Sequence, residues 1–135
     1  MRYLNKTELK ISSRFLFLSM AMIVLKQDMN HIKNGDFKIK KPYLLLLEEM
    51  LKIATNERRQ LRQIMKKHQL QVLCLRKSEW FTTFLFLSSQ HEERRSYFNP
   101  RIQKNVENIM YGLLKKALNG ESDARSNFAR RLINL

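Results

Sequence analysis

A group of cations near the middle of the chain has the clearest capacity for chemistry. Arg58, Arg62 and Lys66 follow one another at steps of four residues, so they would share one face of a helix, and Arg59 and Lys67 flank them. Neighbouring like charges at this spacing weaken a helix by roughly a few tenths of a kcal/mol per pair. A bound polyanion would relieve this repulsion and release counterions. We therefore expect this ridge to contact phosphates.

The overall charge of the chain supports the same expectation. Its 135 residues include 26 Lys and Arg but only 12 Asp and Glu, which gives a formal net charge of +14. This excess is larger than solubility requires, although a solvated basic face is the simpler explanation. Three lysines that precede the same helix would assist the ridge: Lys38, Lys40 and Lys41. Four further cations near the N-terminus could extend the basic surface: Arg2, Lys6, Lys10 and Arg14.

No other group of residues has the spacing of a catalytic or metal-binding site. His31, His68 and His91 are far apart in the sequence, and a zinc site needs three or four converging ligands. Cys74 lies in an apolar run and should be a buried hydrophobe, while three glycines cannot form a phosphate-binding loop. We expect no catalytic residue, no metal and no cofactor. The first hypothesis is therefore a non-enzymatic protein, nucleic-acid-binding or regulatory, whose partner is a nucleic acid or another polyanion.

The composition indicates a mostly helical domain that would hold these cations in place. Hydrophobic residues make up 44% of the chain, too many for a disordered polycation, and three Gly with two Pro are too few for a β-sandwich or barrel. The first long helix should run from about Thr7, its N-cap, to Asn34. Gly35 should then adopt a left-handed conformation.

Two further long helices are expected. The second begins at Pro42 and carries the ridge on its solvent-exposed second half. Its short connection to the first helix predicts that the two helices pack as an antiparallel pair. The third begins at the N-cap Asn99 and ends at Gly120. Gly112 lies within the third helix, which indicates either the close approach of another backbone or a tolerated surface glycine.

The segment between the second and third helices is rich in aromatic and β-branched residues. Residues 71–75 and 80–87 predict the two strands of a β-hairpin, with residues 76–79 as its loop. The alternative is a helix that begins at Ser78, but the density of aromatic and threonine side chains favours strands.

The two acids and two arginines within residues 90–100 are expected either to pair locally or to brace the hairpin against the third helix, with Arg94 and Arg95 as further candidate phosphate contacts. The predicted fold is therefore mostly α, with three long helices, two of them an antiparallel pair, and one β-hairpin between helices 2 and 3. Residues 1–120 would form this single domain, and residues 121–135 a polar tail that could end in a short helix.

The apolar residues bear on the compartment and on a second hypothesis. The most apolar run, Phe15–Leu25, has eleven residues, whereas a membrane-spanning helix needs about twenty. Read as the core of a signal peptide, it lacks a cleavage site, so we expect a cytoplasmic protein without membrane contact. Seven Met and the four Leu of residues 44–47 suit an adaptable contact surface. The alternative function is a helical protein–protein interaction module, either a homodimer or a protein that binds an acidic protein partner.

Three short motifs together resemble a known family. They are Phe37–Tyr43, Met65–His68 and Glu92–Pro100. They are similar to the small YhjD-like proteins of spore-forming Gram-positive bacteria, over residues 15–115. The resemblance carries no catalytic or binding residue to this chain. It implies a bacterial, phage or mobile-element protein of the cytoplasm.

Overall fold

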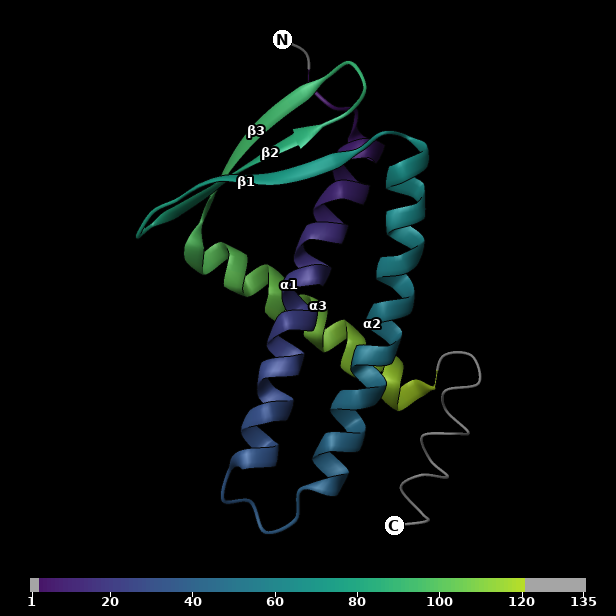
Figure 1. Cartoon of the computed structure of the whole chain (residues 1–135), viewed down its shortest axis with the longest axis vertical. Coiled ribbons are helices and arrows are strands. Elements are labelled where there is room, and N and C mark those ends of the chain that lie inside the picture. The colour runs from purple at the N-terminus through teal and green to yellow at the C-terminus, as the bar shows by residue number, and fades with distance from the viewer. Residues whose placement is uncertain (1–2, 121–135) are drawn as a thin grey trace.

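Three long helices and one three-stranded sheet make up residues 3–120, the part of the chain that this computed structural model describes (Figure 1). The elements in chain order are α1 (Lys6–Asn34), α2 (Lys41–Lys67), β1 (Gln71–Lys77), β2 (Phe81–Leu87), β3 (Glu92–Phe98) and α3 (Asn99–Asn119). α1 and α2 lie side by side and antiparallel, α3 crosses them, and the sheet packs on the N-terminal half of α1 (Figure 1). The prediction of a mostly helical fold with three long helices is confirmed.

Both ends of α1 differ from the prediction. Asn5, not Thr7, is the N-cap: its side chain accepts a hydrogen bond from the Glu8 amide at 2.8 Å, and the Glu8 carboxylate accepts one from the Asn5 amide at 3.0 Å. This reciprocal arrangement satisfies two backbone N–H groups at once. Gly35 is extended, with φ −89° and ψ 179°, so the predicted left-handed conformation is wrong. A Cβ at Gly35 would lie 2.7 Å from the carbonyl oxygen of His31, which explains the absence of a side chain there.

Asn99 fastens the start of α3 to the sheet. It is the first residue of the helix, so its predicted role as N-cap is wrong. Its side-chain nitrogen donates hydrogen bonds to the carbonyl oxygens of Ser78, at 3.1 Å, and Glu79, at 3.0 Å. Its side-chain oxygen accepts a hydrogen bond from the Thr82 hydroxyl at 2.7 Å. Asn99 thus provides hydrogen-bond donors for two backbone carbonyl groups of the turn between β1 and β2. It also fixes the first residue of α3 to the sheet.

The sheet corrects the predicted single hairpin, because it contains a third strand. β1 and β2 form the predicted hairpin, and the alternative helix beginning at Ser78 is wrong. β3 pairs antiparallel with β2, which gives the order β1-β2-β3. The sequence of this strand does not show the usual alternation of apolar and polar residues, because a charged residue occupies an inward position. Glu93 is only 6% exposed and faces the core, and its carboxylate pairs with Arg95.

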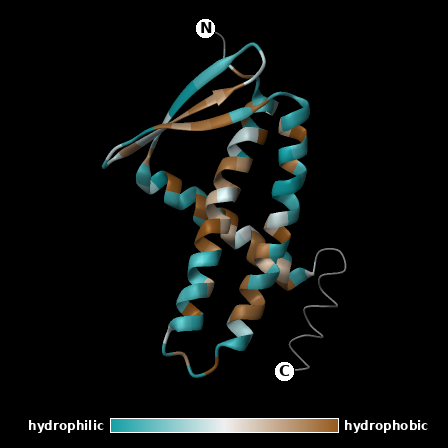
Figure 2. Cartoon of the chain, viewed as in Figure 1, coloured by the Kyte–Doolittle hydropathy of each residue, from teal (hydrophilic) through white to brown (hydrophobic). Residues whose placement is uncertain are grey.

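Two hydrophobic clusters hold the elements together, and α1 belongs to both. The first joins the three helices around Leu18, Ala21 and Leu25, which are fully buried. The second lies between the sheet and the N-terminal half of α1, and its buried members are Leu4, Met65, Leu70, Phe84 and Phe86. Figure 2 shows hydrophobic residues gathered in the middle of α1 and along β1 and β2, whereas the second half of α2 is mostly hydrophilic.

The apolar run Phe15–Leu25 forms the middle of α1, where α2, α3 and the sheet pack around it. Within residues 3–120, no helix combines the length and the hydropathy that crossing a bilayer demands. The predicted polar tail, residues 121–135, lies outside the described residues.

Gly112 has room for a side chain, because a Cβ built there meets no atom of the described residues within 4 Å. Gly112→Ala should therefore raise the free energy of unfolding by about 0.5–1 kcal/mol, since alanine loses less backbone entropy in a helix. Gly35→Ala should lower it, because the new Cβ would meet the His31 carbonyl. Urea denaturation of both variants and the wild type measures these changes. Equal midpoints for the wild type and Gly112→Ala would contradict the first expectation.

Candidate nucleic-acid interface

The cations of the predicted ridge lie on the second half of α2, and the structure divides them into two groups. Arg59, Arg62, Lys66 and Lys67 are exposed, whereas Arg58 is half-buried. Among residues 3–120, no carboxylate lies within ion-pair distance of the four exposed cations. We call these four residues the α2 basic stripe.

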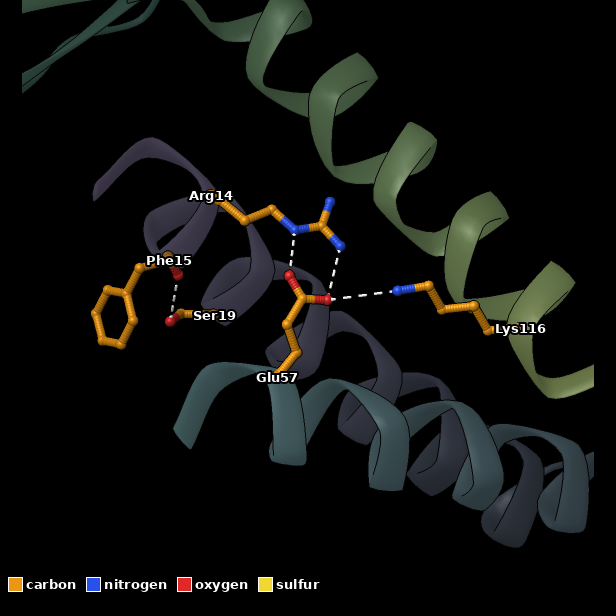
Figure 3. Close-up of polar contacts among 5 residues, drawn as sticks. All are labelled: Arg14, Phe15, Ser19, Glu57 and Lys116. Carbon is orange, nitrogen blue, oxygen red and sulfur yellow. Dashed lines mark hydrogen bonds and ion pairs between the residues drawn. The ribbon is translucent and has the colours of Figure 1, made fainter. Parts of the chain in front are cut away.

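Arg58 contributes to helix packing instead. Its Nε donates a hydrogen bond to the Ser19 hydroxyl at 2.8 Å, and its guanidinium carbon lies 4.6 Å from the centroid of the Phe15 ring. The Ser19 hydroxyl in turn donates to the carbonyl oxygen of Phe15 at 2.7 Å (Figure 3). Together the hydrogen bond and the cation–π contact hold α2 against α1. We therefore separate Arg58 from the candidate phosphate contacts.

A neighbouring ionic contact joins all three helices. The Glu57 carboxylate of α2 accepts hydrogen bonds from Arg14 of α1, at 2.6 Å from Nε and 2.9 Å from Nη2, and Lys116 Nζ of α3 lies 3.9 Å away (Figure 3). The hydrogen bonds from Arg14 hold the pKa of Glu57 below its ordinary value, against the opposing effect of partial burial. The same hydrogen bonds raise the pKa of Arg14. Arg14 and Lys116 thus have a local counter-charge.

The three lysines at the start of α2 are distant from the stripe. Lys38, Lys40 and Lys41 lie at or just before the first residue of α2, and about 27 Å of helix separates Lys41 from Arg59, the nearest cation of the stripe. Lys40 also has a local role, because its Nζ donates a hydrogen bond to the carbonyl oxygen of Lys33 at 2.8 Å. The structure therefore does not bring these lysines and the stripe together.

Two lysines of α1 lie closer to the stripe. Because α1 and α2 are antiparallel, the first turns of α1 lie at the same end of the helix pair as the last turns of α2 (Figure 1). Lys6 and Lys10 are both exposed there. Of the other predicted N-terminal contacts, Arg14 pairs with Glu57, and Arg2 lies outside the described residues.

The histidines do not gather into one site. His31 is in the last turn of α1 and His68 directly follows α2, so these two lie at opposite ends of the antiparallel pair, and His91 lies between β2 and β3. Within residues 3–120, no three His, Cys, Asp or Glu side chains lie close enough together to hold a metal ion. Cys74 is exposed, so its predicted burial is wrong: β1 is an edge strand and holds this side chain at the rim of the sheet. The absence of enzymatic activity stays a prediction.

Sequence reasoning missed one exposed surface, the side of the sheet that faces away from α1. β2 buries Thr82, Phe84 and Phe86, so the intervening residues point outward. Five apolar side chains on this side, at the irregularity of β1 and in the adjoining turn are about half exposed: Leu73, Leu75, Trp80, Phe81 and Phe98. The signal was present in the predicted strand 80–87, which has apolar residues at both its odd and its even positions.

Comparisons with known proteins cover nearly all of the described elements. The family model described as YhjD protein matches residues 3–118. A protein of Bacillus subtilis (strain 168) named "Uncharacterized protein YhjD" is 34% identical over 97 residues, which cover 72% of this chain and 81% of that protein. No solved structure matches the chain. These matches confirm the resemblance that the three short motifs indicated.

Glu57→Gln should lower the free energy of unfolding near neutral pH by about 1 kcal/mol, because it removes the charge that Arg14 and Lys116 face. The pKa of Glu57 is lowered in the folded protein, so this stabilisation is present above the ordinary pKa and is lost as the pH falls through the lowered value.

Urea titrations near pH 7 and near pH 3 measure the difference between Glu57→Gln and the wild type, which should shrink under acid conditions. Glu107→Gln is the control, because Glu107 is exposed and lies 3.9 Å from Lys104 in an i,i+3 pair of little expected energy. A difference between Glu57→Gln and wild type that stays constant with pH would contradict the role of the Glu57 charge.

Proposed function

The chain belongs to the YhjD family, and we propose that it is a nucleic-acid-binding protein of the bacterial cytoplasm that catalyses no reaction. The α2 basic stripe contacts the phosphates, and Lys6 and Lys10 lie at the same end of the helix pair. A separate, second group of candidate contacts consists of Lys38, Lys40 and Lys41.

The distribution of ion pairs is the observation that carries this proposal. Arg14 and Lys116, which point between the helices, share the carboxylate of Glu57. The stripe points to solvent, and among the described residues no carboxylate lies within ion-pair distance of it. A surface that served only solubility would gain from acidic side chains placed between its cations. Like charges on neighbouring turns instead support a partner of high negative charge.

Phosphate contact by these four cations has a measurable signature. Each phosphate that is neutralised releases counterions, so the slope of log K against log salt concentration on a duplex should be about −0.9 per contact. The four residues of the stripe would together give a slope of about −3.6. Such contacts position the nucleic acid but read no bases, so the stripe supports affinity and not sequence preference.

A groove between α2 and α3 supports the second candidate function, a helical protein–protein interaction module. Its volume is about 330 Å³, and its apolar lining comes from Leu46, Leu47, Met50, Met110 and Leu114. Such a groove accepts the apolar face of an amphipathic helix, and methionine adapts its shape to different partners. The module would form a homodimer or would bind an acidic protein partner. Light scattering without nucleic acid tests the homodimer, because its mass would be twice that of the chain.

Arg59→Glu combined with Arg62→Glu should weaken binding strongly, because two attractive contacts become repulsive. We expect the affinity for labelled DNA or RNA at low salt to fall by at least about tenfold, and the salt slope to become shallower by about two units. Fluorescence anisotropy over a series of salt concentrations measures both quantities. Absence of wild-type binding at low salt, or binding that salt does not weaken, would show that the proposal is wrong.

Lys26→Glu combined with Lys104→Glu is the matched control. Both lysines are exposed, one on the second half of α1 and one on α3, neither belongs to the stripe or to the second group, and the double substitution changes the net charge by the same amount. Its affinity should stay close to that of the wild type. Equal losses in the two double variants would assign binding to net charge and not to the stripe. Lys38→Glu with Lys41→Glu tests the second group in the same assay.

A further inference from the structure

We propose that the side of the sheet facing away from α1, which we call the outer face, binds single-stranded nucleic acid by stacking bases on its aromatic rings. The inference deepens the proposed function and rests on it, because it specifies which form of nucleic acid the protein holds. The outer face has Phe81 and Phe98 at one end, and Leu73, Leu85 and Arg94 across its middle.

The strand register determines which side chains share this face. β2 buries Phe84 and Phe86 toward the helices, so Phe81, Thr83 and Leu85 point the other way. Residues directly opposite one another on neighbouring strands point to the same side of a sheet. The partners of these three residues on β1 and β3 therefore lie on the outer face as well.

The outer face is more apolar than a solvated sheet surface. Leu85 stands between Leu73 of β1 and Arg94 of β3, and Phe81 stands opposite Phe98. An antiparallel sheet with one face in water normally has polar residues on that face. β2 is apolar on both sides, a pattern typical of a strand that is covered twice. Because exposed apolar patches of this kind mark interaction sites, we infer that a partner covers this one.

The aromatic residues suit flat partners. The Phe81 and Phe98 rings lie beside one another, with centroids 5.6 Å apart and planes tilted by 54°, and about half of each residue is exposed. Trp80, 59% exposed, precedes Phe81 in the adjoining turn. Every nucleic-acid base has a π-face that stacks on such rings, and only an unpaired strand can turn that face toward a sheet.

The charges of the outer face favour an anionic partner over a second copy of the chain. Arg76 stands opposite Thr83 and Arg94 opposite Leu85, so both arginines lie on this face, with Glu92 as an acidic neighbour. Among the described residues, neither arginine has a carboxylate within ion-pair distance. Two copies packed face to face would enclose four arginines with two glutamates, and unpaired charges are costly to bury. Phosphates would neutralise them instead.

The chain connects the outer face directly to the α2 basic stripe. α2 ends at Lys67 and β1 begins at Gln71, and the three intervening residues turn tightly, with a hydrogen bond from the Leu70 amide to the Met65 carbonyl at 2.8 Å. Gln69, in this turn, has a positive φ of 56°. The last cations of the stripe are therefore adjacent to the first residue of the edge strand. The rings of Phe81 and Phe98 lie at the other end of the sheet, so a nucleic-acid strand bound by the stripe would run along β1 for about 20 Å to reach them.

Phe81→Leu combined with Phe98→Leu removes both rings and keeps the surface apolar. The probes are a labelled single strand about twelve nucleotides long, within the site sizes of known single-strand binders, and a duplex of the same sequence. We expect the affinity for the single strand to fall by about tenfold or more, with the affinity for the duplex and the salt slope unchanged. Tyr111→Leu, at a 59% exposed position on α3, is the control and should change neither affinity. Urea denaturation of each variant verifies that it is folded.

The outcomes distinguish this inference from the proposed function. If the double variant binds the single strand as tightly as the wild type does, the inference is wrong, and the variant Arg59→Glu with Arg62→Glu still tests the stripe independently. If the phenylalanine variant loses single-strand binding but the stripe variant does not, the binding role of the outer face is supported and the proposed phosphate contacts of the stripe are contradicted. If the wild type is a dimer, the phenylalanine variant a monomer and the affinity for nucleic acid unchanged, the face binds a second copy and the inference is overturned.

Discussion

The position of α1 between two hydrophobic clusters is the constraint on which the rest of the structure depends. Leu18, Ala21 and Leu25 are fully buried among the helices, and Leu16 and Met20 contact both clusters. A helix covered on so many sides has almost no polar face along its middle, and the eleven central residues from 15 to 25 accordingly include no charged side chain. The cations of α1 therefore lie on either side of this central segment, toward the two ends of the helix.

The crossing of α3 explains why the second half of α2 is hydrophilic and the first half is not. The first half of α2 contacts both other helices, and it buries Leu45, Met50 and Ala54. Beyond the crossing, α2 packs mainly on α1 and the second cluster, to which it contributes Met65 (Figure 1). Because this half of α2 packs on one side only, most of its helical surface is in water, where cations are tolerated without acidic partners. At the border, Arg58 turns toward α1 and is only half-exposed.

The helices were predictable because their apolar residues recur at three- and four-residue steps, which depends on local geometry alone. The third strand was not, because its inward position is held by Glu93, a charged residue that is buried only through its pairing with Arg95 and the register with β2. The direction of Arg58 was equally hidden, since it depends on Ser19, 39 residues away in the sequence. Residue types and spacing thus identified the basic half of α2 but not which of its cations point to solvent.

The alternation of β2 indicated a second apolar side but not which of the two sides would be exposed, because a strand that is apolar at both odd and even positions does not specify which side is buried. One polar contact distinguishes the two sides. Thr82 donates a hydrogen bond to Asn99, so the even positions of β2 face the start of α3. Phe84 and Phe86 are then buried with Thr82, and Phe81 must lie outside, opposite Phe98. The exposed pair of rings and the contact that anchors α3 to the sheet therefore follow from the same orientation of β2.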